Sequence, residues 1–222
     1  MVRVHVICEG QTEETFIKEV LSRGLRGRAI HLLPALVGKP GHKGGALTPQ
    51  RLLGDIRTRL LGDTTAYCTT LFDYYRLPKG FPGREEALRG QNTRDRARCI
   101  CSGLTEYLRQ ALGEDAVRRF VPYVQMHEFE GILFSSPVAF ATGIGQPQLV
   151  SGLQNIRKLF DTPEDINDGD ETAPSKRISR LYPAYDKPLF GSLAAMEMGL
   201  DVIRKECPLF NEWVSTLEAL PE

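Results

Sequence analysis

Acidic side chains follow several apolar stretches of this 222-residue sequence. Glu9 comes directly after VRVHVIC, Asp73 after AYCTTLF, and Glu128 and Glu130 shortly after FVPYVQM. Carboxylate oxygens are the hard ligands that Mg²⁺ and Mn²⁺ prefer. Carboxylates that meet away from water repel one another unless a cation compensates their charge. The pattern therefore predicts a site for Mg²⁺ or Mn²⁺ with Glu9, Asp73, Glu128 and Glu130 as ligands.

The apolar stretches are typical of strands that alternate with helices. Alternating valines predict a strand at 2–7, and β-forming residues predict further strands at 29–37 (interrupted by Pro34), 66–72 and 120–126. Apolar stripes predict helices at 12–24, 49–62 and 95–112. This order predicts an α/β fold with a mostly parallel sheet of about four strands flanked by helices. Ligands of such sheets gather at the carboxyl ends of the strands, so we expect the acidic residues to meet there.

Two of these acidic positions depend on local geometry. Glu128 and Glu130 are two residues apart, so an extended backbone would point both side chains to one side. Thr12 is a candidate cap for the first helix, with Glu13 in its first turn. Glu13 could therefore bind a second ion or orient water, or it could serve only the helix N-terminus. His127 would point away from its acidic neighbours, which favours a packing role.

The C-terminal third has no strand pattern. Residues 161–175 are acidic and polar, as expected for a loop or lid, and helices are expected near 193–204 and 209–220. We therefore expect an α/β core over residues 1–140 and a helical C-terminal extension over residues 141–222 that packs on it.

Composition narrows the class of protein. Lysine and arginine number 28, as do aspartate and glutamate, which argues against general coating of a polyanion but permits a local basic groove. No apolar run approaches the roughly 20 residues that cross a bilayer, and Glu9 interrupts the N-terminus before a signal-peptide core forms. Five scattered cysteines fit reduced thiols. We expect a cytoplasmic protein without membrane contact, and the oligomeric state stays open.

Several basic residues could hold phosphate. The loop GKPGHKGG at 38–45 lacks the spacing of a P-loop, so we interpret it as a flexible connection. Lys176 and Arg177 could stabilise charge on a phosphoryl group or form a solvated pair, and the same alternatives apply to Lys187. A group of arginines could follow a nucleic-acid backbone, although interspersed acids favour a solvated cluster. These are Arg84, Arg89, Arg94, Arg96 and Arg98.

Glu9-Gly10 after the first strand and Asp73 after the third resemble the TOPRIM domain of topoisomerases, primases and overcoming-lysogenization-defect (OLD) nucleases. More specifically, CEGQTEETF, LFDYYRLP, HEFEGILFS, SKRI and CPLFNEW resemble a family of uncharacterised TOPRIM-like bacterial proteins. Members are often encoded beside AAA or SMC-like ATPases in defence or mobile-element regions. The resemblance implies a TOPRIM-like core, bound Mg²⁺ or Mn²⁺, and DNA or RNA as substrate.

The chain departs from the TOPRIM pattern at one position. TOPRIM domains usually carry Asp-x-Asp after the third strand, whereas this chain has Asp73-Tyr74-Tyr75. The resemblance to OLD nucleases implies that Glu128 and Glu130 supply the missing ligand. It also implies that Glu9 is a metal ligand or general base and that Asp73 is a metal ligand.

Three functions remain open from the sequence. The leading hypothesis is a metal-dependent phosphodiesterase on DNA or RNA, with Glu9, Glu13 and Lys176 as catalytic residues and an ATPase as partner. The second is a phosphatase in which Asp73 is the nucleophile, as in haloacid-dehalogenase-like enzymes, although the N-terminal Asp-x-Asp of those enzymes is absent. The third is a binding subunit of an ATPase complex with a degenerate site, which the missing second aspartate favours.

Overall fold

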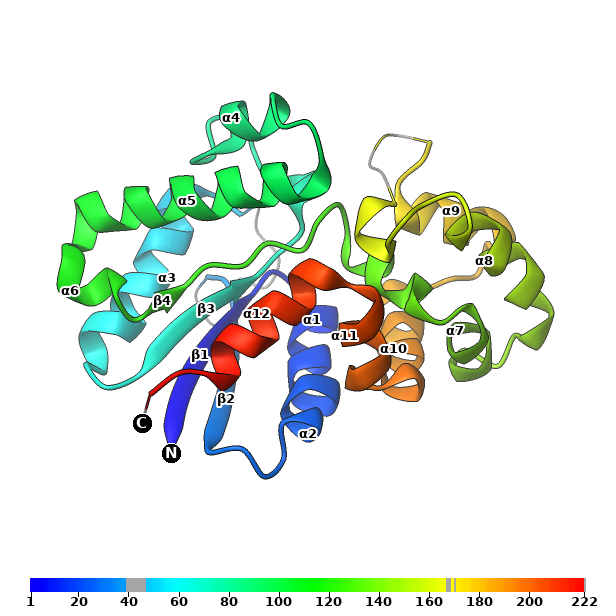
Figure 1. Ribbon diagram of the computed structural model, residues 1–222, viewed down its shortest axis with the longest axis horizontal. Helices are drawn as coiled ribbons and strands as arrows, with labels where there is room; N and C mark the ends of the chain where they lie inside the picture. Colours follow the sequence, from blue (N-terminus) through cyan, green and yellow to red (C-terminus); the bar gives the residue numbers. More distant parts are fainter. Residues whose placement is uncertain (39–46, 167–168, 170, 222) are drawn as a thin grey trace.

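A four-stranded parallel sheet forms the centre of the protein (Figure 1). The computed structural model describes residues 1–38, 47–166, 169 and 171–221. The strand order is β2-β1-β3-β4, and the strands are β1 (Val2–Cys8), β2 (Ile30–Leu36), β3 (Tyr67–Leu71) and β4 (Phe120–Val121). The predicted α/β class, with a parallel sheet flanked by helices and a helical C-terminal part, is confirmed.

The edge strands differ from the prediction. Pro34 lies inside β2, where a proline is tolerated because β2 is at the edge of the sheet. β4 is much shorter than the predicted 120–126. The reason is that Thr70 Oγ1, rather than a backbone carbonyl, accepts the hydrogen bond from Tyr123 N at 3.2 Å and donates to Tyr123 O at 2.7 Å. Further along, the two segments pair again beyond the end of β3, at an isolated bridge between Asp73 and Gln125.

One face of the sheet packs against the N-terminal helix and α12 (Pro208–Glu218) (Figure 1). The N-terminal helix runs through α1 (Gln11–Phe16), the π-helical η1 (Ile17–Leu21) and α2 (Ser22–Gly24). Its N-cap is Gly10, not Thr12 as predicted. Trp213 of α12 donates from Nε1 to Thr69 Oγ1 at 2.8 Å, which fixes α12 to β3.

The other face packs against α3 (Pro49–Gly62) and α5 (Thr93–Leu112) (Figure 1). Both helices agree closely with the prediction, and the side chains of Thr48 and Asn92 cap them. Short helices α4 (Arg84–Leu88) and α6 (Glu114–Val117) precede and follow α5.

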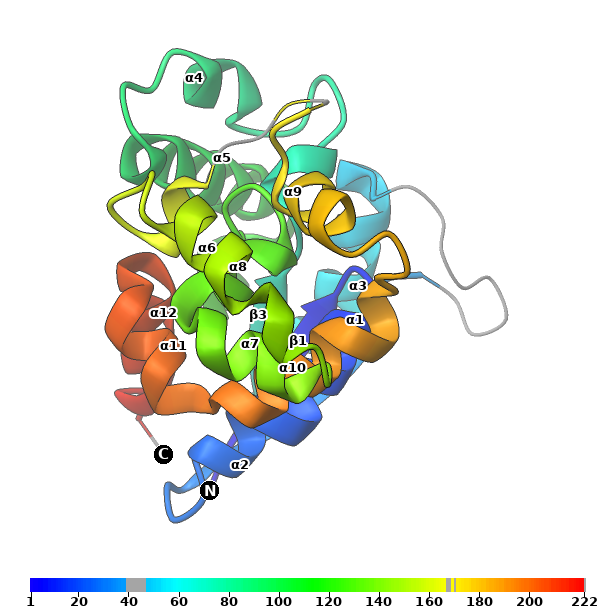
Figure 2. The ribbon, with the colours of Figure 1, turned by 90° about the vertical axis from the view of Figure 1, so that its right-hand side faces the viewer.

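Residues 137–206 add helices beside the carboxyl edge of the sheet, and Figure 2 turns this side toward the viewer. They are α7 (Pro137–Gly143), α8 (Val150–Arg157), α9 (Pro174–Leu181), α10 (Ser192–Met198) and α11 (Leu200–Glu206). Short helical turns lie between these helices: η4 (Pro147–Leu149), η5 (Pro163–Asp165) and η6 (Lys187–Gly191). Two more lie earlier in the chain, η2 (Tyr74–Arg76) after β3 and η3 (Phe129–Ser135) before α7. The single helix predicted at 193–204 is divided at Gly199, whose φ of 76° suits glycine.

Two predicted loops lie partly or mostly outside the described residues. GKPGHKGG at 38–45 is described only at Gly38. The acidic segment at 161–175 contains η5, and its residues 167, 168 and 170 are not described. In the described ranges, no helix has the length and apolar character needed to cross a membrane. All five cysteines lie in these ranges and are free thiols.

Candidate functional site

Glu9 and Asp73 lie side by side where β1 and β3 end. Glu9 N donates to Leu71 O at 3.2 Å, which carries the pairing of the two strands one residue beyond β1. The Glu9 carboxylate then accepts a hydrogen bond from Asp73 N at 3.2 Å. Asp73 is 3% exposed, and its Oδ1 accepts from Phe129 N at 2.8 Å. The predicted meeting of these two acids at the carboxyl edge is therefore observed.

Glu13 enters the same region from the first turn of α1. Its side chain is buried, although it belongs to a helix start where a solvated acid would be ordinary. Gly10 makes this position accessible, because a Cβ at residue 10 would lie only 3.0 Å from Glu13 Oε2. The Glu9-Gly10 pair thus places one carboxylate and leaves room for another.

Glu128 and Glu130 do not point to one side as predicted. Glu128 itself is extended, but the chain does not continue as a strand: His127 before it has a φ of 63°, uncommon for a residue with a side chain, and η3 begins at Phe129 after it. Glu130 is 1% exposed and faces the Asp73 region, whereas Glu128 Oε2 accepts from Ser175 N at 2.9 Å in the first turn of α9. His127 is buried with its ring edge-to-face against Tyr74.

Lys187 is the cation that these carboxylates surround. Its Nζ lies 3.1 Å from Asp73 Oδ2, 3.1 Å from Glu130 Oε2 and 3.4 Å from Glu13 Oε1. Nζ donates a hydrogen bond to Asp73, whereas its contact with Glu130 is an ion pair without hydrogen-bond geometry. The Lys187 side chain is 28% exposed, so solvent reaches the cluster from its side. We call Glu9, Glu13, Asp73, Glu130 and Lys187 the acidic cluster.

The acidic cluster holds more negative than positive charge. Burial, together with the charge of Asp73, raises the pKa of Glu9 to about 7. Burial, together with the charges of Asp73 and Glu128, raises the pKa of Glu130 to about 7 although Lys187 opposes this. The pKa of Asp73 is also raised, chiefly by burial. Burial disfavours the charged form of Lys187, but the surrounding carboxylates outweigh it and raise the lysine pKa, so Lys187 stays protonated.

The chemistry of the acidic cluster fits a divalent cation. Its donors are carboxylate oxygens, and the Lys187 ammonium group acts as a stand-in cation among them. Glu130 Oε1 is buried and accepts no hydrogen bond from any described residue. No three His, Cys, Asp or Glu side chains of the described residues are grouped closely enough to hold a metal ion. The donor atoms are of the kind that Mg²⁺ and Mn²⁺ prefer, but the cation that lies among them is Lys187 Nζ.

Other basic candidates lie apart from the acidic cluster. Lys176 is exposed on α9, one residue after the Ser175 amide that binds Glu128. Arg177 lies over the ring of Phe160, 5.2 Å from its centroid. The sequence offered both Lys176 and Lys187 as candidates to stabilise phosphate charge, with Lys176 as the catalytic candidate, and the structure places Lys187 beside the acids. No local signal separates them, because the choice depends on how η6 packs against α1 and η3.

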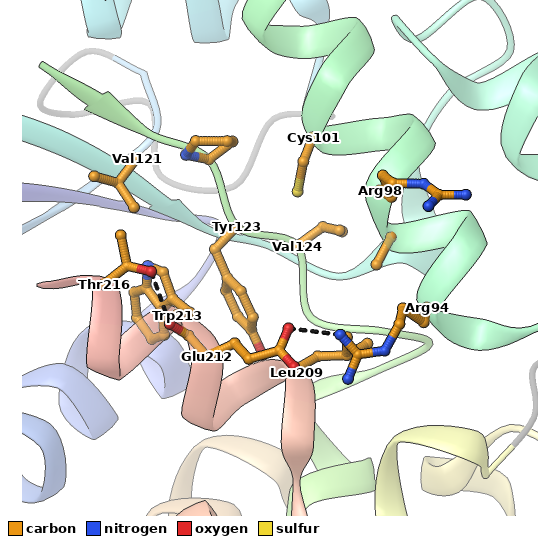
Figure 3. Close-up of a pocket in the computed structure, with 12 residues that line it drawn as sticks. Arg94, Arg98, Cys101, Val121, Tyr123, Val124, Leu209, Glu212, Trp213 and Thr216 are labelled. Atoms are coloured by element: carbon orange, nitrogen blue, oxygen red, sulfur yellow. Dashed lines mark hydrogen bonds and ion pairs between the residues drawn. The ribbon is translucent and has the colours of Figure 1, made fainter. Parts of the chain in front are cut away.

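The arginines near α4 and α5 are partly neutralised. Arg94 pairs with Glu212 at 2.7 Å and Arg98 with Asp95 at 2.8 Å. Arg94 also stands at a cavity of about 360 Å³ between α5, β4 and α12, where its ion pair with Glu212 joins the two helices (Figure 3). The apolar side chains of Val121, Tyr123 and Trp213 contribute to the lining of this cavity. None of the residues that line it belongs to the acidic cluster.

The fold and the site define a class of protein: a parallel α/β domain with a buried acidic cluster at the carboxyl edge of its sheet. Within it, the chain belongs to a family described as a domain of unknown function, DUF4276, which matches residues 8–218. No curated protein and no solved structure matches the chain. The family fits the expected resemblance to uncharacterised proteins and gives no support of its own to a TOPRIM or OLD relationship.

Proposed function

We propose that this protein is a divalent-metal-dependent phosphodiesterase that cleaves DNA or RNA in the manner of TOPRIM and OLD nucleases. The observation that carries the proposal is the acidic cluster at the carboxyl edge of a parallel sheet: Glu13, Asp73 and Glu130 pair with Lys187, and Glu9 lies beside Asp73. Such an edge is where α/β proteins bind ligands. Hydrolysis of a phosphodiester needs positive charge at the phosphoryl oxygens and a base for water, and the cluster offers groups for both.

Each side chain has a role that its environment suits. Glu9, Asp73 and Glu130 would hold Mg²⁺ or Mn²⁺, with Glu13 beside them, and the ion would polarise a phosphoryl oxygen and acidify bound water. Glu9, with a pKa of about 7, is partly ionised near neutral pH and can accept a proton from water on Oε1. Lys187, rather than the predicted Lys176, can donate from Nζ to a non-bridging phosphate oxygen. Glu128 serves the first turn of α9 and is left out of this set.

A binding subunit without catalysis is the second candidate. Asp73-Tyr74-Tyr75 lacks the second aspartate of the TOPRIM pattern, and Lys187 already pairs with three of the carboxylates. In that case the cluster would be a locked structural element and the protein would act by binding an AAA or SMC-like ATPase. The ATPase partner follows from the resemblance in both candidates, as does a place in cytoplasmic antiphage defence.

A cleavage assay separates the two candidates. The purified protein is incubated with supercoiled DNA, single-stranded DNA and RNA, each with Mg²⁺, Mn²⁺ or EDTA. We expect cleavage only with a divalent ion, and we expect Glu9→Gln and Asp73→Asn each to lower the rate by about 100-fold or more, as loss of a base or of charge stabilisation does. Circular dichroism confirms that the variants fold.

Glu85→Gln is the matched control. Glu85 is exposed on α4, so this substitution makes the same chemical change outside the acidic cluster. Its rate should equal that of the wild type. Equal rates for the wild type, Glu9→Gln and Asp73→Asn would overturn the proposal, as would the absence of cleavage of every substrate with both ions. The binding subunit would then be the remaining candidate.

A further inference from the structure

Lys187 occupies the place that a divalent cation would need. The ammonium nitrogen lies 3.1 Å from oxygens of both Asp73 and Glu130, two carboxylates that come from different segments of the chain. A divalent ion held by Asp73 and Glu130 would need the space that Nζ takes between them. A divalent ion and an ammonium group held between the same carboxylates would repel each other strongly in a buried site, so the site cannot hold both at once.

The remaining groups of the acidic cluster indicate that one lysine does not complete it. Three carboxylates pair with the single ammonium group, and a fourth, that of Glu9, lies beside Asp73. Glu130 is almost fully buried, and its Oε1 accepts no hydrogen bond from the described part of the chain although Oε2 faces Lys187. A buried carboxylate oxygen without a partner is costly, and a cation that binds both oxygens removes this cost.

The segment that carries Lys187 is built differently from the segments that carry the acids. Glu9 and Asp73 extend from the central strands β1 and β3, whereas Lys187 opens η6, a short π-helical turn. Its neighbours Asp186, Pro188 and Leu189 are exposed. Glu9 and Asp73 are therefore positioned by the sheet, whereas the lysine stands on a surface turn from which its long side chain can swing outward.

We propose that Lys187 is an internal counter-ion that exchanges with a divalent cation: it neutralises the acidic cluster in the metal-free protein and swings out when the ion binds. This exchange concerns metal binding at the site of the proposed function. It rests on the proposed function only in what the bound ion is used for. After the exchange, the displaced ammonium group lies at the solvent side of the cluster, where an anionic substrate would approach.

The first test compares Mn²⁺ affinity by titration calorimetry in the wild type, Lys187→Met and Lys205→Met. Methionine keeps an unbranched side chain and removes the charge, which lies 5.8 Å from the centroid of the Phe129 ring in the wild type. Lys205 is exposed on α11 and is the matched control. We expect Lys187→Met to bind Mn²⁺ about tenfold or more tightly than the wild type, which is the factor that a modest gain in binding free energy produces. We expect no change for Lys205→Met.

The second test uses the wild type alone and does not depend on the folding of a variant. Lysines are labelled with an amine-reactive reagent, with and without saturating Mn²⁺, and the label at Lys187 is quantified by mass spectrometry. We expect Mn²⁺ to increase labelling of Lys187 several-fold relative to Lys205.

Three results would overturn the exchange: equal or weaker Mn²⁺ affinity in folded Lys187→Met, Lys187 labelling that Mn²⁺ leaves unchanged or lowers, or no Mn²⁺ binding by either protein. These outcomes are distinct from failure of the proposed function. The exchange can hold in a protein that cleaves no nucleic acid, and cleavage can occur in a protein whose lysine stays in place.

Discussion

The buried carboxyl group of Glu130 should make the stability of the metal-free protein depend on pH near neutrality. Glu130 is 1% exposed, and burial raises its pKa from 4.5 to about 7. Glu130→Gln keeps the size of the side chain and removes the titration. The comparison therefore isolates one ionisable group in a cluster that contains several.

The sign and size of the effect follow from proton linkage. Between pH 4.5 and about 7 the folded protein binds a proton at Glu130 that the unfolded chain has released, so stability falls as pH rises through this window. The difference between 4.5 and about 7, at about 1.4 kcal/mol for each pH unit, corresponds to about 3.5 kcal/mol over the whole titration. Because part of this lies below pH 5, the free energy of unfolding of Glu130→Gln, measured relative to the wild type, should rise by about 2.5 kcal/mol between pH 5 and pH 8.

Urea unfolding in EDTA at pH 5, 6, 7 and 8 measures this difference directly. Glu85→Gln, which removes an exposed acid on α4, should follow the wild type at each pH. If the curves of Glu130→Gln and the wild type stayed parallel over the whole range, Glu130 would titrate normally. Burial in the acidic cluster would then not hold the Glu130 carboxyl group protonated near neutral pH.

Two further substitutions test how the acidic cluster and the sheet are held. Gly10→Ala should keep the fold and weaken Mn²⁺ binding several-fold in calorimetry. The reason is that the alanine Cβ would lie 3.0 Å from Glu13 Oε2 and would move that carboxylate. An unchanged Mn²⁺ affinity would show that Glu13 does not belong to the metal site. Trp213→Phe should lower the free energy of unfolding by about 1–3 kcal/mol, because Thr69 Oγ1 loses its buried donor and the ring stacking on Tyr123 is reduced. A midpoint of urea unfolding equal to that of the wild type would contradict this prediction.

Part of the site could be predicted because it depends on local patterns. Alternating apolar residues identify β1 and β3, and the residue after each strand must stand at the carboxyl edge. Glu9 and Asp73 were therefore placed correctly relative to each other, and their contact is a single hydrogen bond from Asp73 N. The sheet class follows from the same patterns, since helices between the strands require parallel pairing.

The rest of the site depends on backbone conformations and tertiary packing that no short pattern encodes. The positive φ of His127 and the 3₁₀ turns of η3 separate Glu128 from Glu130, whereas alternation assumed an extended chain. Lys187 reaches Asp73 across 114 positions of sequence. Such a contact is fixed only when η6 packs beside α1 and η3, so composition could not distinguish Lys187 from the exposed Lys176.

The composition of the acidic cluster favours a binding role over a stabilising one. Four buried or half-buried carboxylates against one ammonium group leave up to three negative charges uncompensated, a number that protonation of Glu9 or Glu130 lowers only in part. Apolar side chains of similar volume usually stabilise a fold as well as a buried ion pair does, and better than unpaired buried charge. Apolar residues could therefore stabilise this part of the fold without these acids. A site that exchanges lysine for a divalent ion, in contrast, requires more carboxylates than the single lysine neutralises.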